Sequence, residues 1–140
     1  MKTLIVEDSS TLCAIYEAYL DDSGYEVHTV ETFTGALMAL ESLKPDLILL
    51  DIELPDGNGL DLLAETVLMK PQPAVGVMTG HGIEFADQAI ERGADDFLGK
   101  PFDASRLRVT LANVAQRLEL TQKLSQLGEK RERLGSILGS

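Results

Sequence analysis

The sequence predicts an α/β fold, a doubly wound, five-stranded parallel sheet with helices on both faces. Apolar runs of strand length alternate five times with segments whose apolar residues recur at helical spacing. One run, residues 47–50, is apolar throughout, as expected for a central strand that is buried on both faces. The chain has 140 residues, 44% of them hydrophobic, which is enough to fill the core of one domain.

The individual elements follow from these runs and from the residues that interrupt them. We expect strands at residues 3–6, 26–30, 47–50, 74–78 and 97–98. Helical stripes lie between them, at Leu12, Ile15, Tyr16, Tyr19 and Leu20, then at Phe33, Ala36, Leu37 and Leu40, then at Leu60, Leu63, Val67 and Leu68. Ser9 or Ser10 suits the cap of the first helix and Gly24 its end, and Pro45 keeps helix out of the third strand.

The last part of the chain is expected to form an extended C-terminal helix. From Asp103 onward, Leu107, Leu111, Val114 and Leu118 repeat as in a helix docked on the domain. A second stripe follows on a rotated face, with Leu120, Leu124, Leu127, Leu134 and Leu138 interrupted by Arg131. We therefore expect a domain at 1–118 and a helical linker at 119–140 that pairs with another helix as a coiled coil. The alternative is an exposed amphipathic extension without a fixed partner.

Composition excludes several classes of protein. The formal net charge of −11 argues against binding to nucleic acid, which needs clustered cations. Cys13 is the single cysteine, so no intramolecular disulfide is possible, and its apolar helical setting indicates a buried thiol. Neither a signal peptide nor an apolar run of membrane-spanning length occurs in the sequence. We expect a cytoplasmic protein that does not contact the membrane.

Chemically active residues stand where the predicted strands end. The first strand ends in Glu7 and Asp8, the third in Asp51, the fourth in Thr79, and the fifth in Lys100. In a parallel sheet these ends share one edge, where ligands bind. Three carboxylates at one edge require a cation, and oxygen ligands suit Mg²⁺. A lysine and a hydroxyl beside them suit the oxygens of a phosphoryl group that a carboxylate attacks.

Four segments together resemble the receiver domains of bacterial two-component response regulators. They are LIVEDSS, DLILLDIELPDGNGLDLL, VGVMTGHG and GADDFLGKPF, and the resemblance covers residues 3 to about 118. It implies a CheY-like sheet with strand order 2-1-3-4-5. It also implies roles for individual residues: Asp51 as phosphoacceptor; Asp8, Asp51 and the backbone carbonyl of Glu53 as Mg²⁺ ligands, with Glu7 acting through a water; Thr79 and Lys100 on the phosphoryl oxygens; Phe97 as switch aromatic; and a cis peptide before Pro101.

The resemblance also implies partners. The phosphoryl donor would be a sensor histidine kinase or a phosphotransfer protein, and the receiver would switch the dimerisation and output of a transcription activator. Segment LGSILGS resembles the junction that precedes the ATPase module of NtrC-type activators, and other segments resemble their quorum-sensing branch. ATPase and DNA-binding domains are therefore expected in the full-length protein. The receiver itself would not be an enzyme, beyond its own phosphorylation and slow autodephosphorylation.

Other interpretations remain open at this point. A stand-alone relay receiver needs only residues 1–118, and the tail argues against it. A Mg²⁺-dependent aspartyl-phosphate phosphatase of the haloacid-dehalogenase type would carry Asp-x-Asp on its first motif strand, whereas Ile52 and Glu53 follow Asp51 here. Simpler interpretations apply to single residues: turn formation for Pro55, Asp56, Gly57 and Gly59, core filling for Phe97, and an exposed loop for His81.

Overall fold

The computed structural model describes residues 1–80 and 83–138. Five parallel strands form the main sheet: β1 (Lys2–Val6), β2 (Glu26–Val30), β3 (Leu47–Asp51), β6 (Ala74–Thr79) and β7 (Asp96–Gly99). Their order is β2-β1-β3-β6-β7. Counted over these five strands alone, this is 2-1-3-4-5, so the predicted sheet is confirmed. A two-stranded antiparallel hairpin, β4 (Glu53–Leu54) and β5 (Gly57–Asn58), was not predicted.

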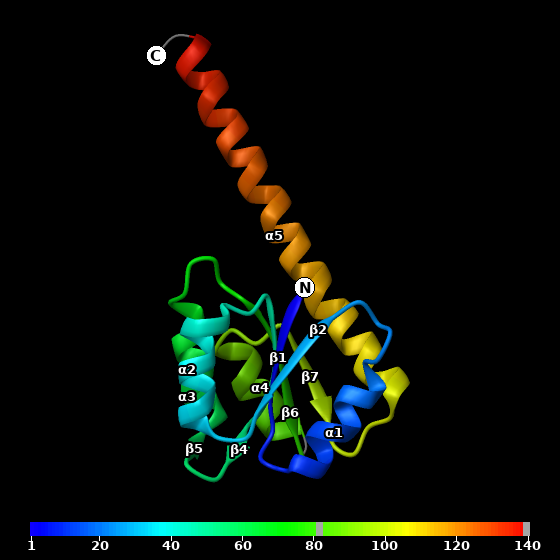
Figure 1. Cartoon of the computed structure of the whole chain (residues 1–140). Helices are drawn as coiled ribbons and strands as arrows, with labels where there is room; N and C mark the ends of the chain where they lie inside the picture. The colour runs from blue at the N-terminus through cyan, green and yellow to red at the C-terminus, as the bar shows by residue number, and fades with distance from the viewer. Residues whose placement is uncertain (81–82, 139–140) are drawn as a thin grey trace.

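Helices cover both faces of the sheet (Figure 1). The helices α2 (Phe33–Leu43), α3 (Gly59–Val67) and α4 (Ile83–Glu91) pack on one face, and α1 (Ser10–Tyr19) and α5 (Ala104–Leu138) on the other. Successive residues of a strand pack against the helices on opposite faces of the sheet, because side chains alternate across a strand. In β3, Ile48 and Leu50 join the core beside α2 and α3, while Leu49 joins the core beside α1 and α5. Every residue of this strand is buried, as its apolar run predicted.

The ends of α1 are set by local hydrogen bonds. Ser9, rather than Ser10, caps the helix, since its side chain accepts a hydrogen bond from the Leu12 N–H at 3.2 Å. The helix ends at Tyr19, so the prediction that Gly24 ends it is wrong. Gly24 instead adopts a positive φ of 86° in the turn before β2, a conformation that glycine adopts without steric cost.

The prediction that the apolar stripe of α3 continues through Val67 and Leu68 is wrong. Val67 is 43% exposed and Leu68 is 78% exposed, and the buried position is taken by Thr66. The Thr66 hydroxyl donates to the Leu63 carbonyl oxygen at 2.7 Å, which satisfies its polar group inside the core.

One long helix, α5, both packs on the sheet and extends away from it (Figure 1). Its first part buries the predicted stripe Leu107, Leu111, Val114 and Leu118. Leu118 packs with Leu47 and Ala74, the first residues of β3 and β6, so α5 leaves the domain at the edge where the strands begin.

Beyond Leu118 the next leucines of α5 are exposed instead of buried. Leu120, Leu124 and Leu127 are exposed by 58%, 63% and 56%. Just before them, Arg117 fixes the helix to the domain: its Nη2 donates to Asp95 Oδ2 at 2.9 Å and its Nε lies 2.7 Å from Asp95 Oδ1.

None of the helices described for residues 1–80 and 83–138 is long and apolar enough to cross a membrane.

Candidate functional site

Three carboxylates meet where β1 and β3 end. Glu7 and Asp8 follow β1, and Asp51 is the last residue of β3, the strand next to β1 in the sheet. One oxygen of each carboxylate lies within 4.8 Å of the others. Glu7 is completely buried and Asp51 is 4% exposed, whereas Asp8 faces solvent. The structure thus brings together the acidic residues that the strand ends indicated.

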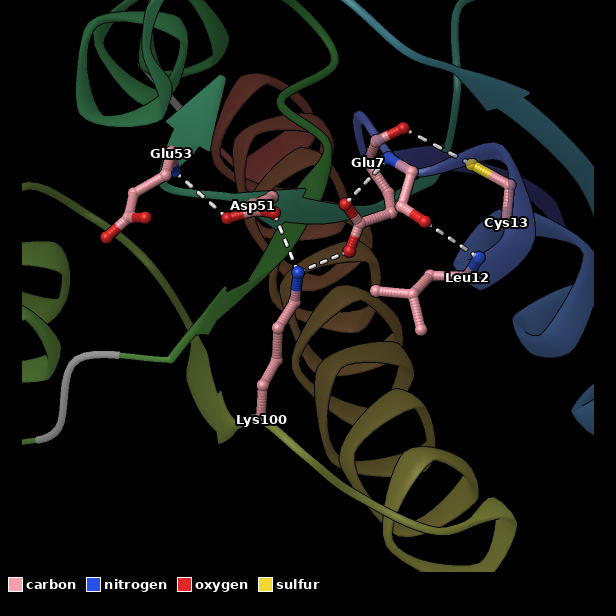
Figure 2. A network of polar contacts seen from close by, with 7 residues as sticks. Glu7, Leu12, Cys13, Asp51, Glu53 and Lys100 are labelled. Carbon is pink, nitrogen blue, oxygen red and sulfur yellow. Dashed lines mark hydrogen bonds and ion pairs between the residues drawn. The ribbon is translucent and has the colours of Figure 1, made fainter. Parts of the chain in front are cut away.

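Lys100 lies between two of these carboxylates (Figure 2). It follows β7, and its Nζ donates hydrogen bonds to Asp51 Oδ2 at 2.8 Å and to Glu7 Oε1. Burial alone would lower the pKa of Lys100, but the hydrogen bonds and attraction from Asp51 and Glu7 hold it above its usual value. The ammonium therefore stays charged and compensates part of the buried negative charge.

Both the carboxylate and the backbone groups of Glu7 make hydrogen bonds. Burial raises its pKa, and the hydrogen bond from Lys100 opposes that rise. Its Oε2 accepts a hydrogen bond from the Ser9 N–H at 3.2 Å, and its own N–H donates to the Val30 carbonyl oxygen at 3.0 Å. The thiol of Cys13 donates to its carbonyl oxygen at 3.3 Å. That thiol is buried, as predicted, and burial raises its pKa to about 11, which disfavours the reactive thiolate at neutral pH.

The other oxygen of Asp51 is also occupied. Its Oδ1 accepts a hydrogen bond from the Glu53 N–H at 3.0 Å, which brings the main chain of Glu53 against the site while the Glu53 side chain points outward (Figure 2). Gly59 also contributes to this site, although from the sequence it was expected only to form a turn. A Cβ on Gly59 would lie 2.4 Å from the Asp51 carbonyl oxygen. Only glycine lets α3 begin this close to the acidic strand end.

Thr79 and Phe97 lie on the two neighbouring strands β6 and β7, and Pro101 directly follows Lys100 in the chain. Thr79 ends β6, is almost fully buried, and accepts a hydrogen bond from the Lys100 N–H at its carbonyl oxygen, at 2.8 Å. Phe97 is half-buried within β7, and the Lys100–Pro101 peptide is cis. His81 lies outside the described residues. The residues named from the strand ends therefore all lie at one edge of the sheet.

This arrangement suits a hard divalent cation. Carboxylate and carbonyl oxygens are the ligands that Mg²⁺ prefers, and it usually takes only one or two carboxylates and keeps several waters. Asp8 and Asp51 provide such oxygens. A positive charge already lies between Glu7 and Asp51, because the Lys100 ammonium contacts both. The donor set and the charge of the site therefore fit a metal ion beside the lysine.

Comparison with known proteins decides the family. Residues 3–112 match the model of the response regulator receiver domain. The chain belongs to the response regulator receiver domain family. Receivers act in two-component signalling, and this membership contradicts the phosphatase alternative.

Similar receiver domains occur in larger regulators. The luminescence regulatory protein LuxO of Vibrio campbellii is 40% identical over 114 residues, which are 81% of this chain and 25% of LuxO. A solved signal receiver domain from Vibrio parahaemolyticus, described as part of a LuxO repressor, is 37% identical with a TM-score of 0.82, covering 88% of this chain and 95% of that one. NtrX from Brucella abortus, solved with ADP, is 36% identical with a TM-score of 0.84, covering 90% and 29%. The receiver chain spans about a quarter of the length of LuxO.

A cavity of about 540 Å³ lies apart from this receiver site. Its lining includes Pro45 and Asp46, which precede β3, and Leu118, where α5 leaves the domain. It is therefore at the opposite edge of the sheet from Asp51 and takes no part in the acidic site.

Gly59→Ala tests the close approach of α3 to Asp51. The new Cβ must displace the Asp51 backbone, so we expect the free energy of unfolding to fall by about 1–3 kcal/mol, as for other overpacked positions. Chemical denaturation measures this change. Gly128→Ala is the control, because its Cβ meets nothing within 4 Å and should cause no loss. Equal stability of the two variants would contradict the tight contact.

Proposed function

We propose that Asp51 accepts a phosphoryl group from the phosphohistidine of a sensor histidine kinase or phosphotransfer protein. The observation that carries this proposal is the carboxylate of Asp51, buried at a strand end and held between the Lys100 ammonium and the Glu53 N–H. Glu7 shares the same lysine and the same acidic cluster, but it is completely buried, whereas Asp51 ends a strand and is 4% exposed. Membership in the receiver family supports the same residue.

The chemistry follows from these contacts. An oxygen of Asp51 attacks phosphorus, the phosphorus–nitrogen bond of the donor breaks, and the imidazole leaves with the electron pair and takes up a proton. Lys100 already reaches Asp51, so its ammonium is positioned to contact an oxygen of the phosphoryl group. Thr79 offers a hydroxyl from the neighbouring strand end. The receiver supplies this geometry for its own phosphorylation and slow autodephosphorylation and turns over no other substrate.

Mg²⁺ is the cofactor that the donor set fits. Asp8, Asp51 and the carbonyl of Glu53 would hold the ion, and Glu7 would act through a bound water. When bound, Mg²⁺ offsets negative charge on the phosphoryl oxygens. Glu7 keeps its contact with Lys100 and so fixes the direction of the lysine side chain.

Phosphorylation would act as a switch through Thr79 and Phe97. A phosphoryl group adds about 1.5 to 2 negative charges at Asp51 and draws in the groups that can contact it. The Lys100 N–H is bonded to the Thr79 carbonyl, so the ends of β6 and β7 move together. Phe97 lies in β7, just before the segment that leads into α5. We expect the output of the switch to be the surface formed by α4, β7 and α5.

The helical part beyond residue 118 would carry that output. We propose that residues 1–118 are the receiver and 119–140 a linker whose leucines pair with a second copy as a short coiled coil. We further propose a full-length cytoplasmic transcription activator with ATPase and DNA-binding domains, which the greater length of LuxO and NtrX and the ADP bound to NtrX support. Exposed Leu120, Leu124 and Leu127 follow the spacing that such pairing needs.

Asp51→Asn should abolish phosphorylation, because an amide cannot form the acyl phosphate. Intact-mass spectrometry after incubation with acetyl phosphate or the cognate kinase and Mg²⁺ will show one added phosphoryl group on the native chain and none on the variant. Asp61→Asn, an exposed carboxylate on α3, is the control and should be modified normally. Modification of the Asp51 variant at the native rate would refute the assignment.

Substitutions of Asp8 and Lys100 should change Mg²⁺ affinity in opposite directions. Asp8→Ala removes a proposed ligand, and we expect the Kd to rise at least roughly tenfold, since even outer-shell substitutions reach that size. Lys100→Met removes the ammonium that competes for Asp51 and Glu7, and the Kd should fall. Calorimetric titration of the folded variants measures both. An unchanged Kd for Asp8→Ala would mean that the acidic pair does not bind the metal.

Removing the outward leucines should weaken self-association. We expect a chain ending at Leu118, and the point variant Leu124→Ser, to dimerise less than the native chain, with and without a beryllofluoride mimic of the phosphoryl group. Sedimentation velocity measures the monomer and dimer fractions. Lys123→Ser changes the neighbouring exposed residue and should leave the dimer intact. If the native chain is monomeric throughout, the linker is an unpaired exposed helix.

A further inference from the structure

The hairpin formed by β4 and β5 connects the acidic site to α2, a helix that is distant from the hairpin in the sequence. It lies between Asp51, which ends β3, and Gly59, which begins α3 (Figure 1). Each of its strands has only two residues, with Glu53 opposite Asn58 and Leu54 opposite Gly57. A ribbon this short does not hold its shape alone. Contacts outside the hairpin must therefore fix it.

Asp56, at the tip of the hairpin, makes the main contact. Its Oδ1 accepts a hydrogen bond from the Phe33 N–H at 2.6 Å, and its Oδ2 accepts from the Thr34 N–H at 3.1 Å and the Thr34 hydroxyl at 3.0 Å. Phe33 and Thr34 begin α2, where backbone N–H groups lack partners within the helix and favour negative charge. The hydrogen bonds from these N–H groups hold the pKa of Asp56 below its ordinary value. The carboxylate is therefore ionised at neutral pH.

This contact is not the ordinary cap of α2. Thr32 already occupies the N-cap position, and its side chain accepts a hydrogen bond from the Gly35 N–H at 2.9 Å. Asp56 bonds to the two N–H groups that Thr32 leaves free, and it does so from more than 20 residues away in the chain. Its contribution is to join two elements rather than to start a helix.

A second contact closes the hairpin against α2. A Cβ added at Gly57 would lie 2.8 Å from Cγ of the Phe33 ring and 3.0 Å from its Cδ2, so the ring packs directly on the backbone of β5. The tip is thus fixed by the hydrogen bonds of Asp56 and by the ring of Phe33. The hairpin can move only if α2 moves or these contacts break.

The base of the hairpin carries groups of the acidic site. The Glu53 N–H donates to Asp51 Oδ1 at 3.0 Å, and the Gly59 N–H donates to the Ile52 carbonyl oxygen at 2.7 Å. We propose that Asp56 is a positioning residue for the phosphoacceptor site. Asp56 ties the hairpin to α2 and so holds the main chain of Glu53 in place for Mg²⁺. This inference rests on the proposed function, because Glu53 matters there as a proposed metal ligand.

Asp56→Ala tests the inference in the metal-free and the metal-bound protein. Without metal, amide hydrogen exchange followed by NMR should be faster at Glu53 and Gly59, because the hairpin loses its anchor. With Mg²⁺ as the probe, titration should give a Kd raised roughly tenfold, as for other groups that orient a ligand. Asp56→Asn retains one acceptor oxygen and should recover part of both effects.

Asp61→Ala is the matched control. It removes the same charge from an exposed position on α3 and should change neither exchange nor Kd beyond a small general effect of charge. Suppose instead that Asp56→Ala lowers the melting temperature but matches Asp61→Ala in exchange at Glu53 and in Kd. Asp56 would then only stabilise α2, and the inference would be overturned.

The two proposals fail in different ways. If Asp8→Ala leaves Mg²⁺ binding unchanged, the metal assignment itself is wrong. The exchange measurement on the metal-free Asp56→Ala protein still decides whether Asp56 holds Glu53 against Asp51.

Discussion

The contact of the Lys100 ammonium with Glu7 and Asp51 is the interaction on which the site depends. Two carboxylates withdrawn from water repel each other, and an uncompensated buried charge costs several kcal/mol. One lysine reduces that cost for both. The strand order allows the contact, because β1 and β3 are neighbours and β7 lies close enough for a long side chain to cross the end of β6. The strand order therefore brings the carboxylates and the lysine together as one unit, and the lysine offsets the charge of both Glu7 and Asp51.

Much of this unit could be predicted, for a physical reason. A central strand of a parallel sheet is buried on both sides, so its sequence is apolar throughout, and the polar residue that ends such a run is conspicuous. Asp51 after residues 47–50 is the clearest example. Parallel strands bring these ends to the same edge, so Glu7 and Lys100 could be grouped with Asp51 without knowledge of any contact.

The parts that could not be predicted depend on tertiary contacts. Val67 fits the apolar period of α3, yet Thr66 is buried in its place, because the orientation of the helix is set by packing and the hydroxyl finds a backbone acceptor. Strands of two residues have no periodicity, so β4 and β5 read only as a turn. The importance of Gly59 and Asp56 lies in atoms brought close by folding, the Asp51 carbonyl and the start of α2, which no local pattern encodes.

The unbroken course of α5 has a geometric consequence. Its 35 residues correspond to about 50 Å of length, and each residue also turns the helix by about 100°. The contact between Arg117 and Asp95 fixes the angle at which the free part starts. Adding one residue to the free part would send whatever follows to a different side of the axis, whereas adding seven would nearly restore the original side. The helix therefore sets the side of its axis to which its far end faces, as well as the distance of that end from the sheet.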